Sequence, residues 1–131
     1  TAFGYEYGQL PQQDSARFKA DASLIHQFEL AAQNRNLNTK KGLIVTGDQF
    51  IASADKVKTI LKNFPDALCC EMEGAAVGQV AHQFDKPFIV VRAMSDTGSD
   101  DADVSFDEFI IDAGKRSASM LIDLFKMEGN K

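Results

Sequence analysis

The sequence predicts an α/β fold in which short strands alternate with helices. Apolar runs of strand length recur at residues 43–45, 67–70 and 88–94. The segments between these runs carry apolar residues at helical spacing. This alternation is typical of a parallel sheet flanked by helices, because parallel strands need a long crossover connection.

The first half of the chain begins with an irregular segment. Residues 3–11 mix aromatic residues with glycines and predict a structured loop, neither strand nor helix, that exposes aromatic surface. The apolar spacing over residues 21–34 predicts a helix with Asp21 as its N-cap. Residues 41–46 follow as a strand, and the turn signal at 47–48 ends it.

Helices and strands continue to alternate in the second half. An apolar stripe over residues 55–64 predicts a helix. Residues 67–70 form the next predicted strand, residues 75–84 the crossover helix and residues 88–94 a third strand. The capping box at 105–108 predicts the start of a final helix. The stripe of this helix that we expect to be buried consists of Phe109, Ile110, Ala113, Ser117, Met120, Leu121 and Leu124.

Acidic residues follow two of the predicted strands. Glu71 and Glu73 come directly after residues 67–70, and Asp96 follows residues 88–94. A right-handed crossover returns the chain to the same edge of the sheet, where open α/β sheets bind small ligands. We therefore expect these three carboxylates at one edge. A structural role is the alternative, because acidic side chains often begin helices, where the helix dipole favours them.

Composition and charge argue against several classes of partner. The 131 residues suffice for one domain. A net charge of -5, with no basic run, argues against nucleic acids and anionic membranes. No phosphate-binding glycine motif indicates a nucleotide cofactor, and no metal site is expected. Cys69 and Cys70 are adjacent in a predicted strand, which makes them poor disulfide partners and indicates a reduced, cytoplasmic protein.

Five segments of the chain resemble a known family. They are Ala-Phe-Gly-Tyr-Glu-Tyr-Gly-Gln-Leu-Pro at 2–11, Thr-Gly-Asp-Gln-Phe-Ile at 46–51, Cys-Glu-Met-Glu-Gly-Ala-Ala at 70–76, Val-Val-Arg-Ala-Met-Ser-Asp at 90–96 and Ser-Phe-Asp-Glu-Phe at 105–109. In this order they resemble the bacterial 5'-methylthioadenosine/S-adenosylhomocysteine nucleosidases. The resemblance spans essentially the whole chain and is specific, because five separate segments agree.

The resemblance implies that this chain is only part of a family member. Residues 1–131 correspond to the C-terminal part of a single nucleosidase domain, and the chain begins at Thr1 without an initiator methionine. We therefore expect the N-terminal part to be absent. The implied fold is a mixed sheet flanked by helices, similar to that of the purine nucleoside phosphorylases.

The same resemblance implies roles for the residues at the expected edge. Asp96 resembles the general acid that protonates adenine N7. For an aspartate with a reference pKa of about 3.9, this role requires a raised pKa in a dry pocket. Glu73 resembles the residue that binds the ribose hydroxyls, where its charge favours the cationic transition state. Met72 resembles the neighbour that lines the ribose and the sulfur side.

Further residues are assigned in the same way. Phe50 and Ile51 correspond to the segment that recognises the adenine edge, and Phe106 to an aromatic wall on the base. Phe3 and Pro11 would reach across a homodimer interface to cover the alkylthio pocket of the partner.

Three residues beside the acid or in the first acidic cluster complete the expected site. Ser95, which we count among the substrate-binding residues, and Arg92 flank the acid and support it. The role of Glu71 stays open between a supporting residue and a helix start.

The activity that the resemblance implies is hydrolysis of the N-glycosidic bond of methylthioadenosine and adenosylhomocysteine, without a cofactor, in methionine salvage. The family's water-activating glutamate lies in the N-terminal part, so the isolated chain is expected to be inactive unless a second chain supplies that part. Two alternatives remain: a purine nucleoside phosphorylase of the same fold, or a nucleoside-binding fragment without activity. The sequence does not rank methylthioadenosine against adenosylhomocysteine, deoxyadenosine or futalosine.

Overall fold

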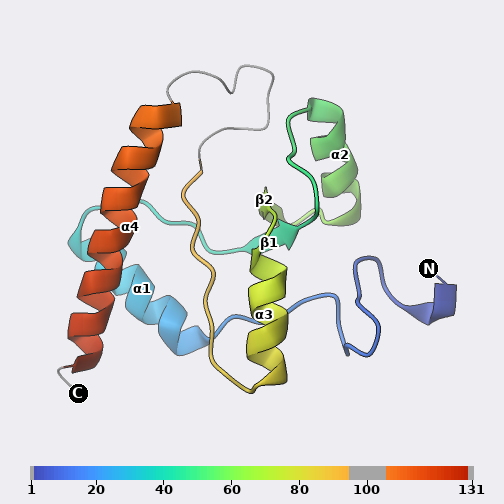
Figure 1. Cartoon of the computed structure of the whole chain (residues 1–131), viewed down its shortest axis with the longest axis horizontal. Helices are drawn as coiled ribbons and strands as arrows, with labels where there is room; N and C mark the ends of the chain where they lie inside the picture. Colours follow the sequence, from blue (N-terminus) through green and yellow to red (C-terminus); the bar gives the residue numbers. More distant parts are fainter. Residues whose placement is uncertain (1, 95–105, 130–131) are drawn as a thin grey trace.

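The computed structural model describes residues 2–94 and 106–129 and confirms the α/β class (Figure 1). The predicted order of helices is confirmed, and so are the first two strands. In chain order the elements are a 3₁₀ turn η1 (Ala2–Gly4), α1 (Ala22–Asn34), β1 (Leu43–Thr46), α2 (Ala54–Asn63), β2 (Ala67–Glu71), α3 (Gly74–Gln83) and α4 (Phe106–Gly129).

The described sheet consists of β1 and β2, which run parallel with α2 as the crossover between them. Leu43 lies opposite Ala67 and Ile44 opposite Cys69, so β2 contains one residue more than β1 at this point. This irregularity is a β-bulge, which shifts the register by one residue. As a result Thr46, the last residue of β1, lies opposite Glu71, the last residue of β2.

The prediction of a third strand over residues 88–94 is wrong. Figure 1 draws this segment as an extended trace, and it forms no ladder with β1 or β2. Its backbone accepts a hydrogen bond at Phe88, whose carbonyl oxygen lies 2.8 Å from the amide nitrogen of Asp21. Apolar, β-branched residues favour an extended chain, but a strand also needs a partner edge in register, which residue type alone does not supply.

Side-chain caps set the starts of the first two long helices. The carboxylate of Asp21 accepts from the amide of Leu24 at 2.8 Å, which confirms the predicted cap of α1. The cap of α2 is Ser53, whose hydroxyl accepts from the amide of Lys56, so this helix begins one residue before the predicted start. Both caps satisfy amides that have no partner inside the helix.

The buried apolar core of the described residues is small and lies between α1 and α4. It consists of Ala31, Ala32 and Met120, and Figure 1 shows α1 crossing beside α4. The prediction that Ile110 and Leu121 lie in the buried stripe of α4 is wrong, because each residue is 49% exposed. The packed side of α4 is narrower than the predicted stripe, since among the described elements α4 packs mainly against α1.

A glycine allows α3 to approach its neighbours closely. Gly78 is buried, and a Cβ at this position would lie 3.0 Å from the Cβ of Phe18 and 3.2 Å from the ring of Phe88. The absence of a Cβ at Gly78 therefore leaves room for Phe18, which precedes α1, and for Phe88, which follows α3.

The opening segment is the structured loop that we predicted over residues 5–11, whereas Ala2–Gly4 form a short 3₁₀ turn that we did not predict. Phe3 within this turn has a φ of 67°, in the left-handed region that is costly for a residue with a side chain. Its side chain is 96% exposed, whereas the ring of Tyr7 packs against Phe64 with the centroids 5.8 Å apart. The predicted exposure of aromatic surface is therefore confirmed.

Candidate functional site

A cleft of about 580 Å³ lies where β2 ends, beside α2. The loop at residues 49–51 and the segment 92–94 complete its lining. Six of the residues that the sequence predicts for the site line this cleft, namely Phe50, Ile51, Glu71, Met72, Glu73 and Arg92. The structure thus gathers residues from three separate segments around one hollow.

Glu71 is the centre of a hydrogen-bonded cluster beside the cleft. Its side chain is only 8% exposed. One carboxylate oxygen accepts from the hydroxyl of Thr46 at 2.5 Å, and the other accepts from the amide of Glu73 at 3.1 Å and from Arg92. The amide of Gly74 lies 2.8 and 2.7 Å from the two oxygens.

These contacts decide the protonation state of Glu71. Burial raises the pKa of this carboxyl and is the largest single influence. The hydrogen bonds from Thr46, the Glu73 amide, Arg92 and the Gly74 amide together outweigh it, so the pKa lies below the ordinary value of glutamate. Glu71 is therefore a carboxylate at neutral pH, and it acts as an acceptor only.

Arg92 connects Glu71 to the second carboxylate. Its guanidinium pairs with Glu71 and lies 2.6 Å from an oxygen of Glu73. These two carboxylates raise the pKa of Arg92, with the hydrogen bond to Glu71 as the largest cause. The side chain of Glu73 is 61% exposed, so its carboxylate remains accessible to a ligand while one side is held by Arg92.

The same cluster caps α3. Glu73 occupies the N-cap position but makes no side-chain capping bond. Instead, Glu71 accepts from the amide of Gly74, and the Thr46 hydroxyl accepts from the amide of Ala75 at 2.9 Å. The helix dipole also favours a negative charge at the N-terminus of α3. Glu71 therefore ends β2, and its carboxylate caps the first turn of α3 within the cluster beside the cleft.

Apolar side chains form the other part of the site. Phe50 is 67% exposed and Met72 is 45% exposed, while Ile51 is half-buried. A cleft lined by an exposed aromatic ring and by carboxylates suits a ligand with a flat heterocycle and hydroxyl groups, because the ring stacks on the heterocycle and a carboxylate accepts from hydroxyls.

Several predicted site residues lie elsewhere or outside the described residues. Ser95 and Asp96 fall outside them, and the side chain of Phe106, the first residue of α4, is also not described. Phe3 and Pro11 do not line the cleft.

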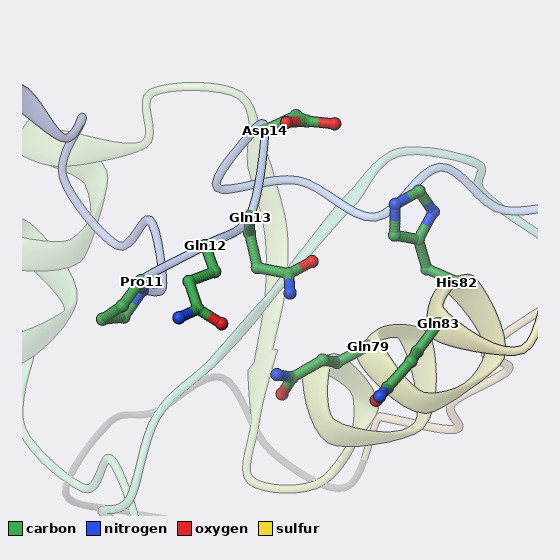
Figure 2. Close-up of a pocket in the computed structure, with 7 residues that line it drawn as sticks. All are labelled: Pro11, Gln12, Gln13, Asp14, Gln79, His82 and Gln83. Atoms are coloured by element: carbon green, nitrogen blue, oxygen red, sulfur yellow. The ribbon is translucent and has the colours of Figure 1, made fainter.

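Pro11 lines a separate hollow of about 410 Å³ between the opening segment and α3, which Figure 2 shows. Its lining is mostly polar and consists of Pro11, Gln12, Gln13, Asp14, Gln79, His82 and Gln83. The residues of α3 that line this hollow belong to the C-terminal half of the helix, whereas the Glu71 cluster lies at its N-terminus. The two hollows are therefore distinct.

Three further features of the described residues bear on the classes of function. Within residues 2–94 and 106–129, no three His, Cys, Asp or Glu side chains are placed to share a metal ion. None of the helices there has the length and apolarity needed to cross a bilayer. Cys69 and Cys70 are free thiols, and burial is the main cause that raises the pKa of Cys69.

Thr46 is the member of the cluster that the sequence did not single out. It ends β1, and its partner Glu71 ends β2, but a regular ladder starting at Leu43 and Ala67 would have paired it with Cys70. The bulge in β2 changes this pairing, and no residue type in the sequence marks the bulge.

Known proteins resemble this chain over almost all of its length. The family model for the phosphorylase superfamily matches residues 1–126. A 5'-methylthioadenosine/S-adenosylhomocysteine nucleosidase from Shewanella pealeana is 50% identical over 127 residues, which cover 96% of this chain and 55% of the relative. The chain therefore spans about half the length of the curated relatives that it matches.

Solved structures show the same similarity. An S-adenosylhomocysteine nucleosidase from Streptococcus pyogenes, in complex with 5-methylthiotubericidin, is 48% identical with a TM-score of 0.84, covering 95% of this chain and 52% of that chain. A 5'-methylthioadenosine/S-adenosylhomocysteine nucleosidase from Neisseria meningitidis, in complex with methylthio-immucillin-A, is 43% identical with a TM-score of 0.87, covering 96% of this chain and 55% of that chain.

Proposed function

We propose a nucleosidase function for this chain, which belongs to the phosphorylase superfamily. The substrates are 5'-methylthioadenosine and S-adenosylhomocysteine, the compounds named for the similar enzymes. The chain forms the C-terminal part of a single nucleosidase domain, which acts in the cytoplasm in methionine salvage. The observation that carries the proposal is the cleft where β2 ends, which is lined by both an exposed aromatic ring and an accessible carboxylate.

Each part of the cleft has a role in this proposal. Adenine lies against Phe50 and Ile51 and is covered by Phe106. Glu73 accepts hydrogen bonds from the ribose hydroxyls, and its charge stabilises the positive charge that develops on the sugar. Met72 lines the ribose and the sulfur side of the substrate.

The chemistry is a displacement at the anomeric carbon of the ribose. A water oxygen forms a bond to C1', the C1'–N9 bond breaks, and its electron pair leaves with adenine. Asp96, with Ser95 beside it, gives a proton to N7, so that adenine leaves as a neutral base. The base that takes the proton of the water belongs to the part of the family that this chain does not match.

A phosphorylase of the same fold and a nucleoside-binding protein without activity are the other candidates. They differ from a nucleosidase in what attacks C1': a phosphorylase uses phosphate, and a binding protein allows no attack. The test requires a protein of the relatives' full length in which this chain forms the matched part, called the full-length protein below.

The deciding experiment measures adenine release from methylthioadenosine by chromatography, with and without phosphate. We expect equal rates in both buffers, with methylthioribose as the sugar product. A rate that depends on phosphate, with a sugar phosphate as product, would establish the phosphorylase. Binding of the nucleoside without release of adenine would establish a nucleoside-binding protein without activity.

Asp96→Asn tests the assignment of the acid in the same assay. We expect turnover to fall about 100-fold or more while nucleoside binding is kept, because an amide donates a hydrogen bond but does not deliver the proton. Turnover within a few-fold of the parent would refute the role of Asp96.

We also propose that the full-length protein is a homodimer in which the opening segment covers the pocket of the partner. Phe3, Tyr7 and Leu10 are 96%, 60% and 42% exposed, so this segment presents several apolar side chains on the surface. Exposed aromatic clusters of this kind mark interaction surfaces. Phe3 and Pro11 are the residues that close the alkylthio end of the neighbouring site.

A further inference from the structure

We propose that Thr46 and Glu71 are positioning residues, which hold Glu73 in the place where it binds the ribose. This inference rests on the proposed nucleosidase function. In this proposal Glu73 contacts the substrate, and Thr46 and Glu71 act through Glu73.

Glu73 is held in place by its neighbours. It lies between the end of β2 and the first residue of α3, and its own side chain caps nothing. Its backbone amide donates to Glu71, and its carboxylate is bound by Arg92, which also binds Glu71. Both ends of Glu73 are therefore tied to the same buried carboxylate.

Glu71 is in turn held by Thr46. The hydroxyl of Thr46 donates to its carboxylate at 2.5 Å and also accepts from the amide of Ala75 at 2.9 Å. Thr46 thus joins the end of β1 to the end of β2 and to the first turn of α3. Because the Glu71 side chain is 8% exposed, water does not readily replace a lost partner.

Gly74 fits closely against the carboxylate of Glu71. A Cβ at position 74 would lie 2.9 Å from Oε1 of Glu71 and 3.2 Å from its Cδ. A side chain at this position therefore requires the carboxylate to move away from its present site. The carboxylate of Glu71 is thus bound by the Thr46 hydroxyl and by the Gly74 amide, and the absence of a Cβ at residue 74 leaves the room that it occupies.

The consequence for catalysis is selective. A displaced Glu71 lets Arg92 and the backbone of Glu73 move with it, so the carboxylate of Glu73 no longer faces the sugar in a fixed geometry. An interaction that stabilises the cationic transition state depends on this geometry more than ground-state binding does. Loss of the Thr46 hydroxyl should therefore weaken transition-state stabilisation more than substrate binding.

The experiment compares Thr46→Val with Thr46→Ser in the full-length protein. Valine keeps the shape of threonine without the hydroxyl, whereas serine keeps the hydroxyl. Thr59→Val is the matched control, because Thr59 is an exposed threonine on α2 whose hydroxyl donates to the carbonyl of Asp55. Two probes are used: 5'-methylthiotubercidin, which is neutral, and an iminoribitol analogue of methylthioadenosine, whose ring nitrogen is protonated.

We expect Thr46→Val to lower the affinity for the cationic probe and kcat by about 10-fold, the scale of one hydrogen bond to a charged group. The affinity for the neutral probe should change less than about 3-fold on the same scale. Thr46→Ser and Thr59→Val should stay near the parent with both probes. Gly74→Ala, which disturbs Glu71 from the opposite side, should repeat the selective loss and serves in place of Thr46→Val if the latter does not fold.

A double variant separates positioning from a general loss of stability. In a Glu73→Gln background, Thr46→Val should have no further effect on the preference for the cationic probe, because the group that it positions has lost its charge. The inference is overturned if Thr46→Val keeps the parent's preference between the probes, or if its effect persists unchanged in the Glu73→Gln background. A parent protein that binds neither probe and releases no adenine would instead refute the proposed function.

Discussion

Replacing the buried carboxylate of Glu71 by an amide should destabilise the full-length protein in a way that depends on pH. Glu71→Gln keeps the shape of the side chain but removes its charge. In the parent the carboxylate accepts from Thr46, Arg92 and the amides of Glu73 and Gly74. A glutamine has one acceptor oxygen, so at least one of these donors must rearrange, and the remaining bonds lose their charge assistance.

The size of the effect follows from the number of bonds that weaken. Hydrogen bonds to charged groups contribute about 1.5–3 kcal/mol each, and neutral ones about 0.5–1.5 kcal/mol. If three donors remain paired at neutral strength, the loss is about 3 kcal/mol on this scale. Arg92 is 36% exposed, so water partly replaces its carboxylate partner. We therefore expect a loss of about 2–3 kcal/mol in the free energy of unfolding at pH 7.

The sign of the pH dependence follows from the lowered pKa of Glu71. A carboxyl with a lower pKa in the folded state stabilises the protein fully above its unfolded pKa, which is about 4.3 for glutamate. That stabilisation is lost as the pH falls from this value through the folded pKa. The difference between parent and Glu71→Gln should therefore be constant from neutral pH down to about one unit above the unfolded pKa, and should shrink below it.

The measurement is urea unfolding followed by circular dichroism over this pH range. Asp112→Asn is the matched control, because Asp112 is a 58% exposed carboxylate paired with Arg116 on the surface of α4. Its effect should stay within about 0.5 kcal/mol, as expected for an exposed pair. The reasoning fails if Glu71→Gln is as stable as the parent at pH 7, or if the difference persists unchanged into acid.

Three further predictions concern the full-length protein. Glu73→Gln should reduce affinity for a cationic ribosyl analogue by about 10-fold or more while a neutral analogue loses little, and equal losses for the two inhibitors would contradict the transition-state role. Phe3→Ala should raise the KM for methylthioadenosine. A mixed dimer with Phe3→Ala in one subunit and Asp96→Asn in the other should show a near-normal KM at about half the sites, because the partner's normal Phe3 covers the one site with an intact acid. If the mixed dimer instead shows the raised KM of the Phe3→Ala homodimer, Phe3 acts within its own subunit. Gly78→Ala should lower the free energy of unfolding by about 1–3 kcal/mol, because the added methyl meets Phe18 and Phe88, and an unchanged urea midpoint would show that these rings move aside without cost.

Much of the fold follows from local patterns in the sequence. Asp21 marks the start of α1, and the helical spacing of apolar residues gives α2 and α4 within one or two residues of their observed starts. The segment 88–94 shows where such reasoning fails. Its apolar residues favour an extended chain, but a strand exists only where another strand offers unpaired backbone groups in register.

The sequence likewise predicts one part of the candidate site and not another. Glu71 and Glu73 lie where β2 ends because they follow this strand directly in the sequence, and they line the cleft there. The crossover to a strand over residues 88–94, which would bring Asp96 to the same edge, is not formed among the described residues. Sequence order gives no information about Thr46, because that contact depends on the register of β1 against β2. The placement of Asp96 stays a prediction, since it lies outside the described residues.

The bulge in β2 has a consequence for how this protein tolerates insertions and deletions. On one side of the bulge, Ala67 is fixed by the tight connection after α2, where its amide donates to the carbonyl of Phe64 at 3.1 Å. On the other side, Glu71 is fixed by its pairing with Thr46. The extra residue at this point absorbs the mismatch between these two requirements. A deletion of one residue at the bulge should therefore leave Thr46 opposite Glu71, whereas a deletion between Cys69 and Glu71 should break this pairing.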